Sequence, residues 1–137
     1  MIQPWLLQPM PNMHLLRQVI EAQAGGGAVD LVLLPEVFNG VSGECDDAAG
    51  PQARQFLSTL ARVCGVNVVG GSIDLRYDDG SVRNTCVVVN AAGNEVGTYA
   101  KRVRFAAERH VRTAGEGPGV FEIAGVRVGV LICADLW

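Results

Sequence analysis

Histidine is scarce in this sequence, and no two of its cysteines form a C-x-x-C pair. The two histidines and the four cysteines (Cys45, Cys64, Cys86 and Cys133) lie at scattered spacings. Zinc sites require closely spaced cysteine and histidine ligands, so none is expected here. Reduced thiols in a cytoplasmic protein are the simple interpretation of these cysteines, and we expect Cys45, Cys64 and Cys86 to be structural.

The sequence also lacks a large excess of charge of one sign and has no long hydrophobic run. Charged residues make up 18% of the chain and the formal net charge is −3, with no basic cluster except the arginines near Lys101. This pattern gives no electrostatic footprint for nucleic acid. The longest apolar stretch, Val128 to Cys133, is too short to span a membrane. The start, Met1 to Pro4, lacks the basic and apolar regions of a signal peptide. We therefore expect no nucleic-acid or membrane partner.

What is present is the composition of one globular domain. Apolar residues make up 49% of the 137 residues, which is enough to bury a core. Apolar periodicity and turn residues predict alternating helices and strands. The first half of the chain is predicted to hold a weak strand near Leu6-Leu7, a helix over 14–24 stopped by Gly25-Gly26-Gly27, a buried strand over 31–34 and a loop over 39–50. A second helix follows over 50–64, and its buried stripe consists of Phe56, Leu57, Leu60, Val63 and Cys64. The remaining predicted elements are strands over 66–70, 82–90, 95–100, 120–123 and 126–133. This order predicts an α/β fold with helices on one side of a sheet.

Three reactive side chains directly follow strand-like runs. Glu36 follows the apolar run over 31–34, Lys101 closes the strand over 95–100, and Cys133 ends the most apolar strand. A rigid sheet that fixes the backbone, with a loop that frees the side chain, is typical of active sites. Taken singly, each has a structural explanation: a solvated loop carboxylate, a solvated edge lysine and a small buried hydrophobe.

In this order and context the three residues resemble the catalytic motifs of the nitrilase, or carbon–nitrogen hydrolase, superfamily. A further glutamate of that family corresponds to Glu108. The matching patterns are Leu31-Val32-Leu33-Leu34-Pro35-Glu36-Val37-Phe38, Tyr99-Ala100-Lys101, Glu108 ahead of Gly115, and Gly129-Val130-Leu131-Ile132-Cys133-Ala134-Asp135. The resemblance covers nearly the whole chain.

The resemblance implies an αββα sandwich and a Glu–Lys–Cys triad that needs no cofactor or metal. Cys133 would attack an amide-type carbon and form a thioester, because splitting the reaction through a thiolate makes hydrolysis of a poor electrophile easier. Glu36 would act as the general base and acid, and Lys101 would stabilise the oxyanion. Glu108 would hold Lys101 or the substrate in place.

The length of the chain differs from that of the family. Family domains are close to twice as long, whereas Trp137 lies four residues past Cys133. The resemblance therefore implies that residues 1–137 form one carbon–nitrogen hydrolase domain that is C-terminally incomplete, with only part of the full sandwich. We expect one unburied sheet face, which favours a homo-oligomer or a complementing chain. The activity of this short chain stays open.

The substrate is constrained by the residues after the nucleophile. Nitrile-hydrolysing members tend to have Trp-Glu there, whereas this chain has Ala134-Asp135, which favours a small-molecule amide. The run from Cys133 to Trp137 also resembles the glutaminase domain of glutamine-dependent NAD synthetases, so glutaminase-type hydrolysis feeding ammonia to a synthetase is an alternative. A catalytically silent module that pairs through an exposed sheet is another. Arg102 and Arg104 could receive a substrate carboxylate or form a solvated face.

Overall fold

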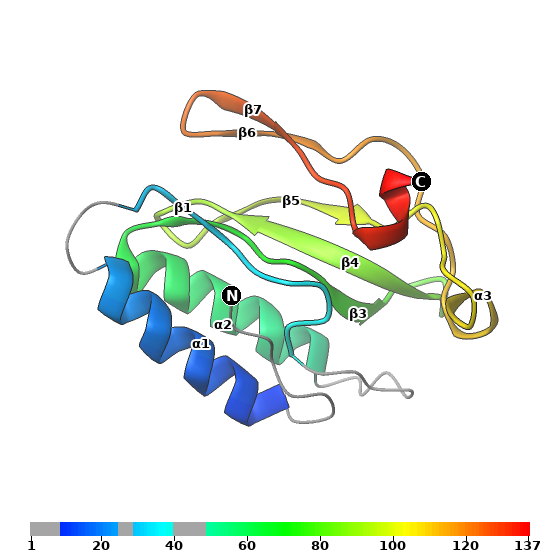
Figure 1. Cartoon of the computed structure of the whole chain (residues 1–137), viewed down its shortest axis with the longest axis horizontal. Coiled ribbons are helices and arrows are strands. Elements are labelled where there is room, and N and C mark those ends of the chain that lie inside the picture. Colours follow the sequence, from blue (N-terminus) through cyan, green and yellow to red (C-terminus); the bar gives the residue numbers. More distant parts are fainter. Residues whose placement is uncertain (1–8, 25–28, 40–48) are drawn as a thin grey trace.

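The computed structural model of the chain describes residues 9–24, 29–39 and 49–137 (Figure 1). Several sequence predictions lie outside these residues: the weak strand near Leu6-Leu7, the helix stop at Gly25-Gly26-Gly27, Cys45, and most of the loop over 39–50.

A five-stranded mixed sheet forms the centre of the fold. Its strands are β1 (Leu31–Leu33), β2 (Asn67–Val69), β3 (Ile73–Arg76), β4 (Val82–Val89) and β5 (Glu95–Ala100). The central strand, β4, has antiparallel neighbours on both sides. On one side it pairs with β2 and β3, which follow one another along its length, and on the other side it pairs with β5. The outer strand, β1, pairs parallel with β2. The strands predicted over 31–34, 82–90 and 95–100 are confirmed to within a residue, and the region after residue 66 forms two strands, β2 and β3.

Two helices, α1 (Pro9–Ala24) and α2 (Ala49–Cys64), cover one face of this sheet (Figure 1). The first begins before the predicted start, and the second matches its prediction to within one residue. In the predicted stripe of α2 the assignment of Val63 is wrong: its side chain is 55% exposed, and Ala53 and Ala61 are buried instead. No helix in the described part of the chain is long and apolar enough to cross a membrane.

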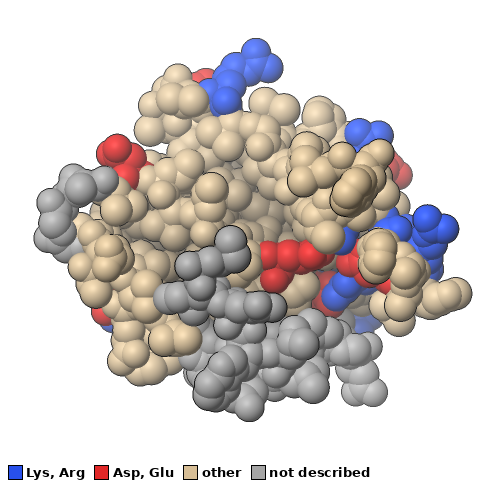
Figure 2. Space-filling model, in the orientation of Figure 1, with Lys and Arg blue, Asp and Glu red and all other residues tan. Residues whose placement is uncertain are grey.

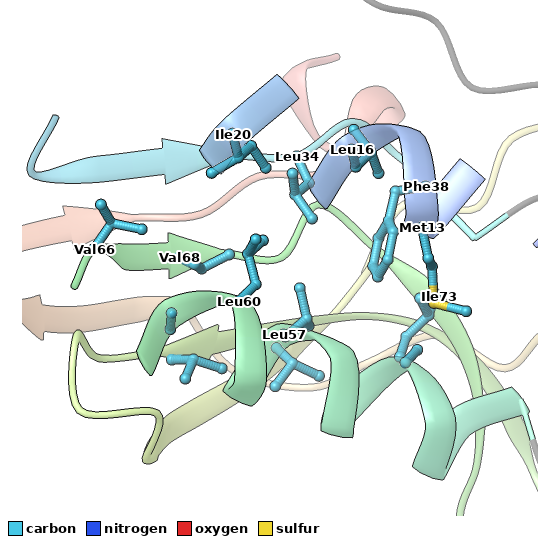
Figure 3. Packing of buried hydrophobic residues seen from close by; sticks show 14 of the residues in the cluster. Met13, Leu16, Ile20, Leu34, Phe38, Leu57, Leu60, Val66, Val68 and Ile73 are labelled. Atoms are coloured by element: carbon cyan, nitrogen blue, oxygen red, sulfur yellow. The ribbon is translucent and has the colours of Figure 1, made fainter. Parts of the chain in front are cut away.

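The main hydrophobic core lies between the helices and the sheet, as Figure 3 shows. Side chains of α1 and α2 meet alternate residues of the strands, because successive residues of a strand point to opposite faces. Leu34 and Phe38, from the segment after β1, point into the same core (Figure 3). The labelled members are Met13, Leu16, Ile20, Leu34, Phe38, Leu57, Leu60, Val66, Val68 and Ile73.

The other face of the sheet is covered by a hairpin of β6 (Val120–Ile123) and β7 (Val126–Gly129) (Figure 1). A second apolar cluster fills this space and leaves Cys86 and Val88 fully buried. The expectation of an unburied sheet face is therefore wrong for the central strand. Exposed apolar side chains lie further out instead, at Val126, Leu131 and Leu136 among others.

The segment that carries Cys133 differs from the sequence prediction. The strand expected over 126–133 ends at Gly129, and Cys133 begins a 3₁₀-helix, η1 (Cys133–Leu136). The Asp135 carboxylate accepts a hydrogen bond from the Ile132 N–H and caps this turn. Apolar periodicity alone did not indicate the turn, because the run stays apolar up to Cys133.

Candidate active site

Glu36 is carried by a short segment that is anchored on both sides. The Leu34 N–H donates to the Val69 carbonyl at 3.0 Å, which continues the β1–β2 pairing. The buried Phe38 fixes the segment beyond Glu36. Between them, Val37 has a φ of 47° and its N–H donates to Ser72 Oγ at 3.0 Å. A β-branched residue rarely adopts positive φ, and such strain persists only where the surroundings impose it.

Lys101 is the most deeply buried charged residue of this site. Its side chain is 2% exposed, and Nζ lies 2.7 Å from Glu36 Oε1 and 3.0 Å from Glu108 Oε2. Burial by itself lowers the pKa of Lys101, but the hydrogen bonds and charges of the two glutamates outweigh it and raise the pKa above its ordinary value. The side chain is therefore held as an ammonium ion between two carboxylates.

Glu108 lies at the start of α3 (Glu108–Val111), a short helix in a region that the sequence indicated only as polar. Its Oε2 accepts the Phe105 N–H at 2.7 Å, and its Oε1 accepts Nη1 of Arg112 at 2.6 Å. Burial tends to raise the pKa of Glu108, but the donors from Phe105 and Lys101 prevail and lower it. Glu108 is therefore a carboxylate that contacts Lys101.

Three further residues complete the charged cluster, and sequence reasoning missed them all. Arg112 donates Nε and Nη2 to the two carboxylate oxygens of Asp74, each at 2.7 Å, in a largely buried bidentate pair. Asn84 donates Nδ2 to Glu36 Oε1 at 2.8 Å. The one available signal was Asn84 itself, a polar residue inside an otherwise apolar strand. Buried polar side chains of this kind need partners.

Cys133 lines the same cavity as Glu36. Both residues line a cavity of about 350 Å³, whose walls include the apolar side chains of Leu34, Val69 and Ile132. Cys133 is exposed and has a φ of 47°. Partial burial and the Glu36 carboxylate raise the pKa of its thiol above the ordinary value, although Lys101 acts in the opposite direction.

The other described cysteines have different surroundings. Cys86 is fully buried, and burial raises the pKa of its thiol to about 12. Cys64 is half-buried at the end of α2, and burial raises the pKa of its thiol as well. Both positions agree with the structural roles expected for them. Among the cysteines that the structure describes, Cys133 alone is exposed.

Charged side chains are unevenly distributed on the face of the molecule that Figure 2 shows. In Figure 2 acidic and basic side chains gather on the right, near α3, while the rest of that face is largely uncharged. Arg102 is exposed, and Arg104 donates to the Arg112 carbonyl at 3.2 Å. Whether either arginine receives a substrate carboxylate stays a prediction. Within the described residues, no group of three or more His, Cys, Asp or Glu could hold a metal ion.

The structure thus brings the four predicted residues to one end of the sheet, where β1 and β5 end and β4 begins. Glu36, Lys101 and Glu108 are in direct contact, and Cys133 shares the cavity of Glu36. A buried ammonium between two carboxylates, next to an exposed thiol, is an arrangement suited to covalent catalysis with proton transfer.

Comparison with known proteins assigns the family. The model of the carbon–nitrogen hydrolase family matches residues 2–137. The chain is 32% identical over 134 residues to omega-amidase NIT2 of Danio rerio, covering 87% of this chain and 48% of that protein. It is 31% identical over 114 residues to 2-oxoglutaramate amidase of Bacillus subtilis (strain 168), covering 78% of this chain and 44% of that protein. This chain belongs to the carbon–nitrogen hydrolase family.

The fold has close counterparts among solved structures. A mutant amidase from Nesterenkonia sp. AN1, with acrylamide added at its active site cysteine, superposes with a TM-score of 0.86 at 22% identity. The match covers 98% of this chain and 55% of that one. The layered α/β fold is therefore shared with this amidase, and this chain spans about half the length of the relatives that it matches.

Proposed function

We propose that this chain carries the catalytic set of a carbon–nitrogen hydrolase that cleaves an amide through a cysteine thioester. Cys133 is the nucleophile, Glu36 the general base and acid, and Lys101 the oxyanion donor. The observation that carries this proposal is the buried Lys101 ammonium held by Glu36 and Glu108 beside the cavity of Cys133. The match of the family model over residues 2–137 supports a single domain for this set.

The first half of the reaction forms the thioester. The raised pKa of Cys133 keeps it a thiol at neutral pH, so the proton has to be removed as the sulfur attacks. Glu36 takes this proton while the carbonyl carbon becomes tetrahedral. The Lys101 ammonium and the Ala134 N–H stabilise the negative oxygen. Glu36 then returns the proton to the nitrogen, the carbon–nitrogen bond breaks, and ammonia or an amine leaves.

The second half releases the acid. A water molecule enters the position of the leaving nitrogen and loses a proton to Glu36 as it attacks the thioester carbon. Lys101 again stabilises the oxyanion, and the carbon–sulfur bond breaks with return of the proton to Cys133. Glu108 stays ionised throughout because its pKa is lowered, and it keeps Lys101 in the ammonium form.

The substrate class that we propose is a small amide. Two relatives at about 30% identity carry the names omega-amidase and 2-oxoglutaramate amidase, which supports an amide substrate. The free thiols of Cys64, Cys86 and Cys133 support a reducing, cytoplasmic setting.

Turnover measurements on three single variants test the proposal. The chain is incubated with a panel of short amides that includes glutamine and 2-oxoglutaramate, together with one nitrile, and released ammonia is measured. Cys133→Ala and Glu36→Gln are expected to lower turnover of the preferred amide by about a thousandfold or more, without a change in the circular dichroism spectrum.

The matched control is Cys64→Ala, which removes a thiol far from the cavity and is expected to keep the activity. Equal losses in all three variants would indicate a folding effect and contradict the assignment. A preference for glutamine over the other amides would favour the glutaminase-type alternative.

A further inference from the structure

The side chain of Asp135 accepts four hydrogen bonds at the edge of the active site. Its Oδ1 accepts the N–H groups of Arg102 and Val103, at 3.0 and 2.8 Å. Its Oδ2 accepts the Tyr99 hydroxyl at 2.8 Å and the Ile132 N–H at 3.0 Å. One carboxylate therefore joins the end of β5 to the turn that begins η1.

These contacts lie on either side of two proposed catalytic residues. Lys101 stands between Tyr99 and Arg102 in the sequence, and Cys133 stands between Ile132 and Asp135. The segments are more than thirty positions apart in the chain, and a hydrogen bond from Tyr99 to Asp135 spans 36 positions. The relative position of the ammonium and the thiol thus depends on a contact that neither residue makes itself.

The backbone at Cys133 needs such support. Its φ of 47° lies in the left-handed region, which is strained for any residue other than glycine. The Ile132 N–H donates to Asp135 Oδ2, and the Asp135 N–H donates to the Ile132 carbonyl at 3.1 Å. This reciprocal pair closes the turn around Cys133 and holds its backbone in the strained conformation.

We propose that Asp135 is a positioning residue, which fixes the Cys133 thiol relative to Lys101 and Glu36 by tying the turn of η1 to the end of β5. The proposal rests on the proposed function, because it assigns a task to Asp135 within that site. Asp135 is not itself a base for the thiol, since both of its oxygens already accept two hydrogen bonds each.

The ionisation of the two side chains agrees with this task. Burial tends to raise the pKa of Asp135, but the N–H donors of Val103 and Ile132 prevail and lower it, so the carboxylate is present at neutral pH. Burial raises the pKa of Tyr99 to about 12, so its hydroxyl keeps the proton that it donates.

Alkylation of each cysteine by iodoacetamide across a pH series, read by peptide mass spectrometry, tests the proposal on the whole chain. The first variant, Asp135→Asn, replaces one of the two acceptor oxygens by an NH₂ group and removes the negative charge. The second, Tyr99→Phe, removes the hydroxyl donor and keeps the charge of Asp135. Asp79→Asn, on the β3–β4 turn, is the matched control for a lost aspartate charge. Cys86, which is fully buried, reports on unfolding.

If Asp135 positions Cys133, the midpoint of Cys133 alkylation falls in D135N by about half a pH unit or more, toward the ordinary thiol value of about 8.5. The reason is that the thiol moves away from Glu36 and into solvent. Y99F is expected to shift the midpoint less, in the same direction, and D79N is expected to match the unmodified chain.

Unchanged midpoints in D135N and Y99F would overturn the proposal. A shift in D135N with none in Y99F would assign the effect to the lost charge and also overturn it. If Cys86 becomes alkylated in D135N, that variant has unfolded and Y99F alone decides: a lowered midpoint of Cys133 alkylation supports the proposal, and an unchanged midpoint overturns it. Because alkylation requires no amide turnover, this result and the outcome of the Cys133→Ala test can fail separately.

Discussion

At the scale of single residues, every charged side chain around Lys101 is paired with one of opposite sign in a largely buried place. Lys101 and Arg112 carry positive charge, and Glu36, Glu108 and Asp74 carry negative charge. Burying a charge is costly unless it is paired and hydrogen-bonded. Each glutamate beside Lys101 also has a further donor of its own. Arg112, which forms a bidentate pair with Asp74, donates to Glu108, and Asn84 donates to Glu36. The ammonium therefore stays charged in spite of its burial.

The lowered pKa of Glu108 predicts a specific pH dependence of stability. A carboxylate whose pKa is lower in the folded state stabilises the fold above its unfolded pKa of about 4.3, and that stabilisation is lost as the pH falls through the folded pKa. At pH 7 we expect Glu108→Gln to lower the free energy of unfolding by about 2 kcal/mol. The difference from the unmodified chain should shrink as the pH falls below about 4.3. Urea unfolding at a series of pH values measures both quantities.

Glu122→Gln is the control for this prediction. Glu122 is an exposed carboxylate on β6, and its replacement is expected to change stability by less than about 0.5 kcal/mol at any pH. A Glu108→Gln difference that stays constant from neutral to acid pH would contradict the prediction, because it would reflect packing and not charge.

At the scale of elements, the break between β2 and β3 determines where Glu36 lies. A side chain at Gly71, whose φ is 54°, would place its Cβ 1.9 Å from the Pro35 carbonyl oxygen, directly before Glu36. The bare backbone at this point lets the Ser72 N–H reach the same carbonyl at 3.3 Å. The close approach of two backbones therefore depends on the missing side chain.

Gly71→Ala is accordingly expected to lower the free energy of unfolding by about 3 kcal/mol or more, because backbone has to move. Amide turnover by the proposed mechanism should fall with it, since Glu36 is displaced. Gly80→Ala is the matched control: its φ of 78° imposes strain, but nothing lies within 4 Å of the added Cβ, so a cost of only about 1–2 kcal/mol is expected. Thermal unfolding compares the two variants, and equal losses would sink the prediction.

At the scale of the whole molecule, apolar side chains are exposed at η1 and at the start of β7. Trp137 is 99% exposed, Leu136 is 72% exposed and Val126 is 61% exposed. Exposed apolar groups of this kind favour association with another protein surface. The sequence predicts a homo-oligomer or a complementing chain, and we propose association through the η1 end of the molecule.

Sedimentation velocity over a range of concentrations tests this proposal. The unmodified chain is expected to self-associate, and the double variant Leu136→Ser, Trp137→Ser to weaken the association by roughly tenfold or more. Val63→Ser is the control, because Val63 is an exposed apolar residue on α2, on the other side of the sheet. Equal effects of the control and the double variant, or no association at all, would count against the proposal.

The sequence by itself determined the order of the elements and the candidate residues. Apolar periodicity and turn residues are local properties, so they were enough to predict α2, β4, β5 and the hairpin of β6 and β7. The motifs around Glu36, Lys101, Glu108 and Cys133 were visible for the same reason, since each is a short run of residues in a recognisable order.

Only the tertiary structure decided how these residues meet. The contact of Lys101 with Glu36, the Arg112–Asp74 pair and three of the four hydrogen bonds of Asp135 join segments far apart in the chain. No local pattern encodes such contacts, because they arise from pairing in the sheet and from packing of the layers. The end of β7 at Gly129 was hidden for a related reason: the apolar run continues to Cys133, while a side chain capping the backbone N–H of Ile132 turns the chain.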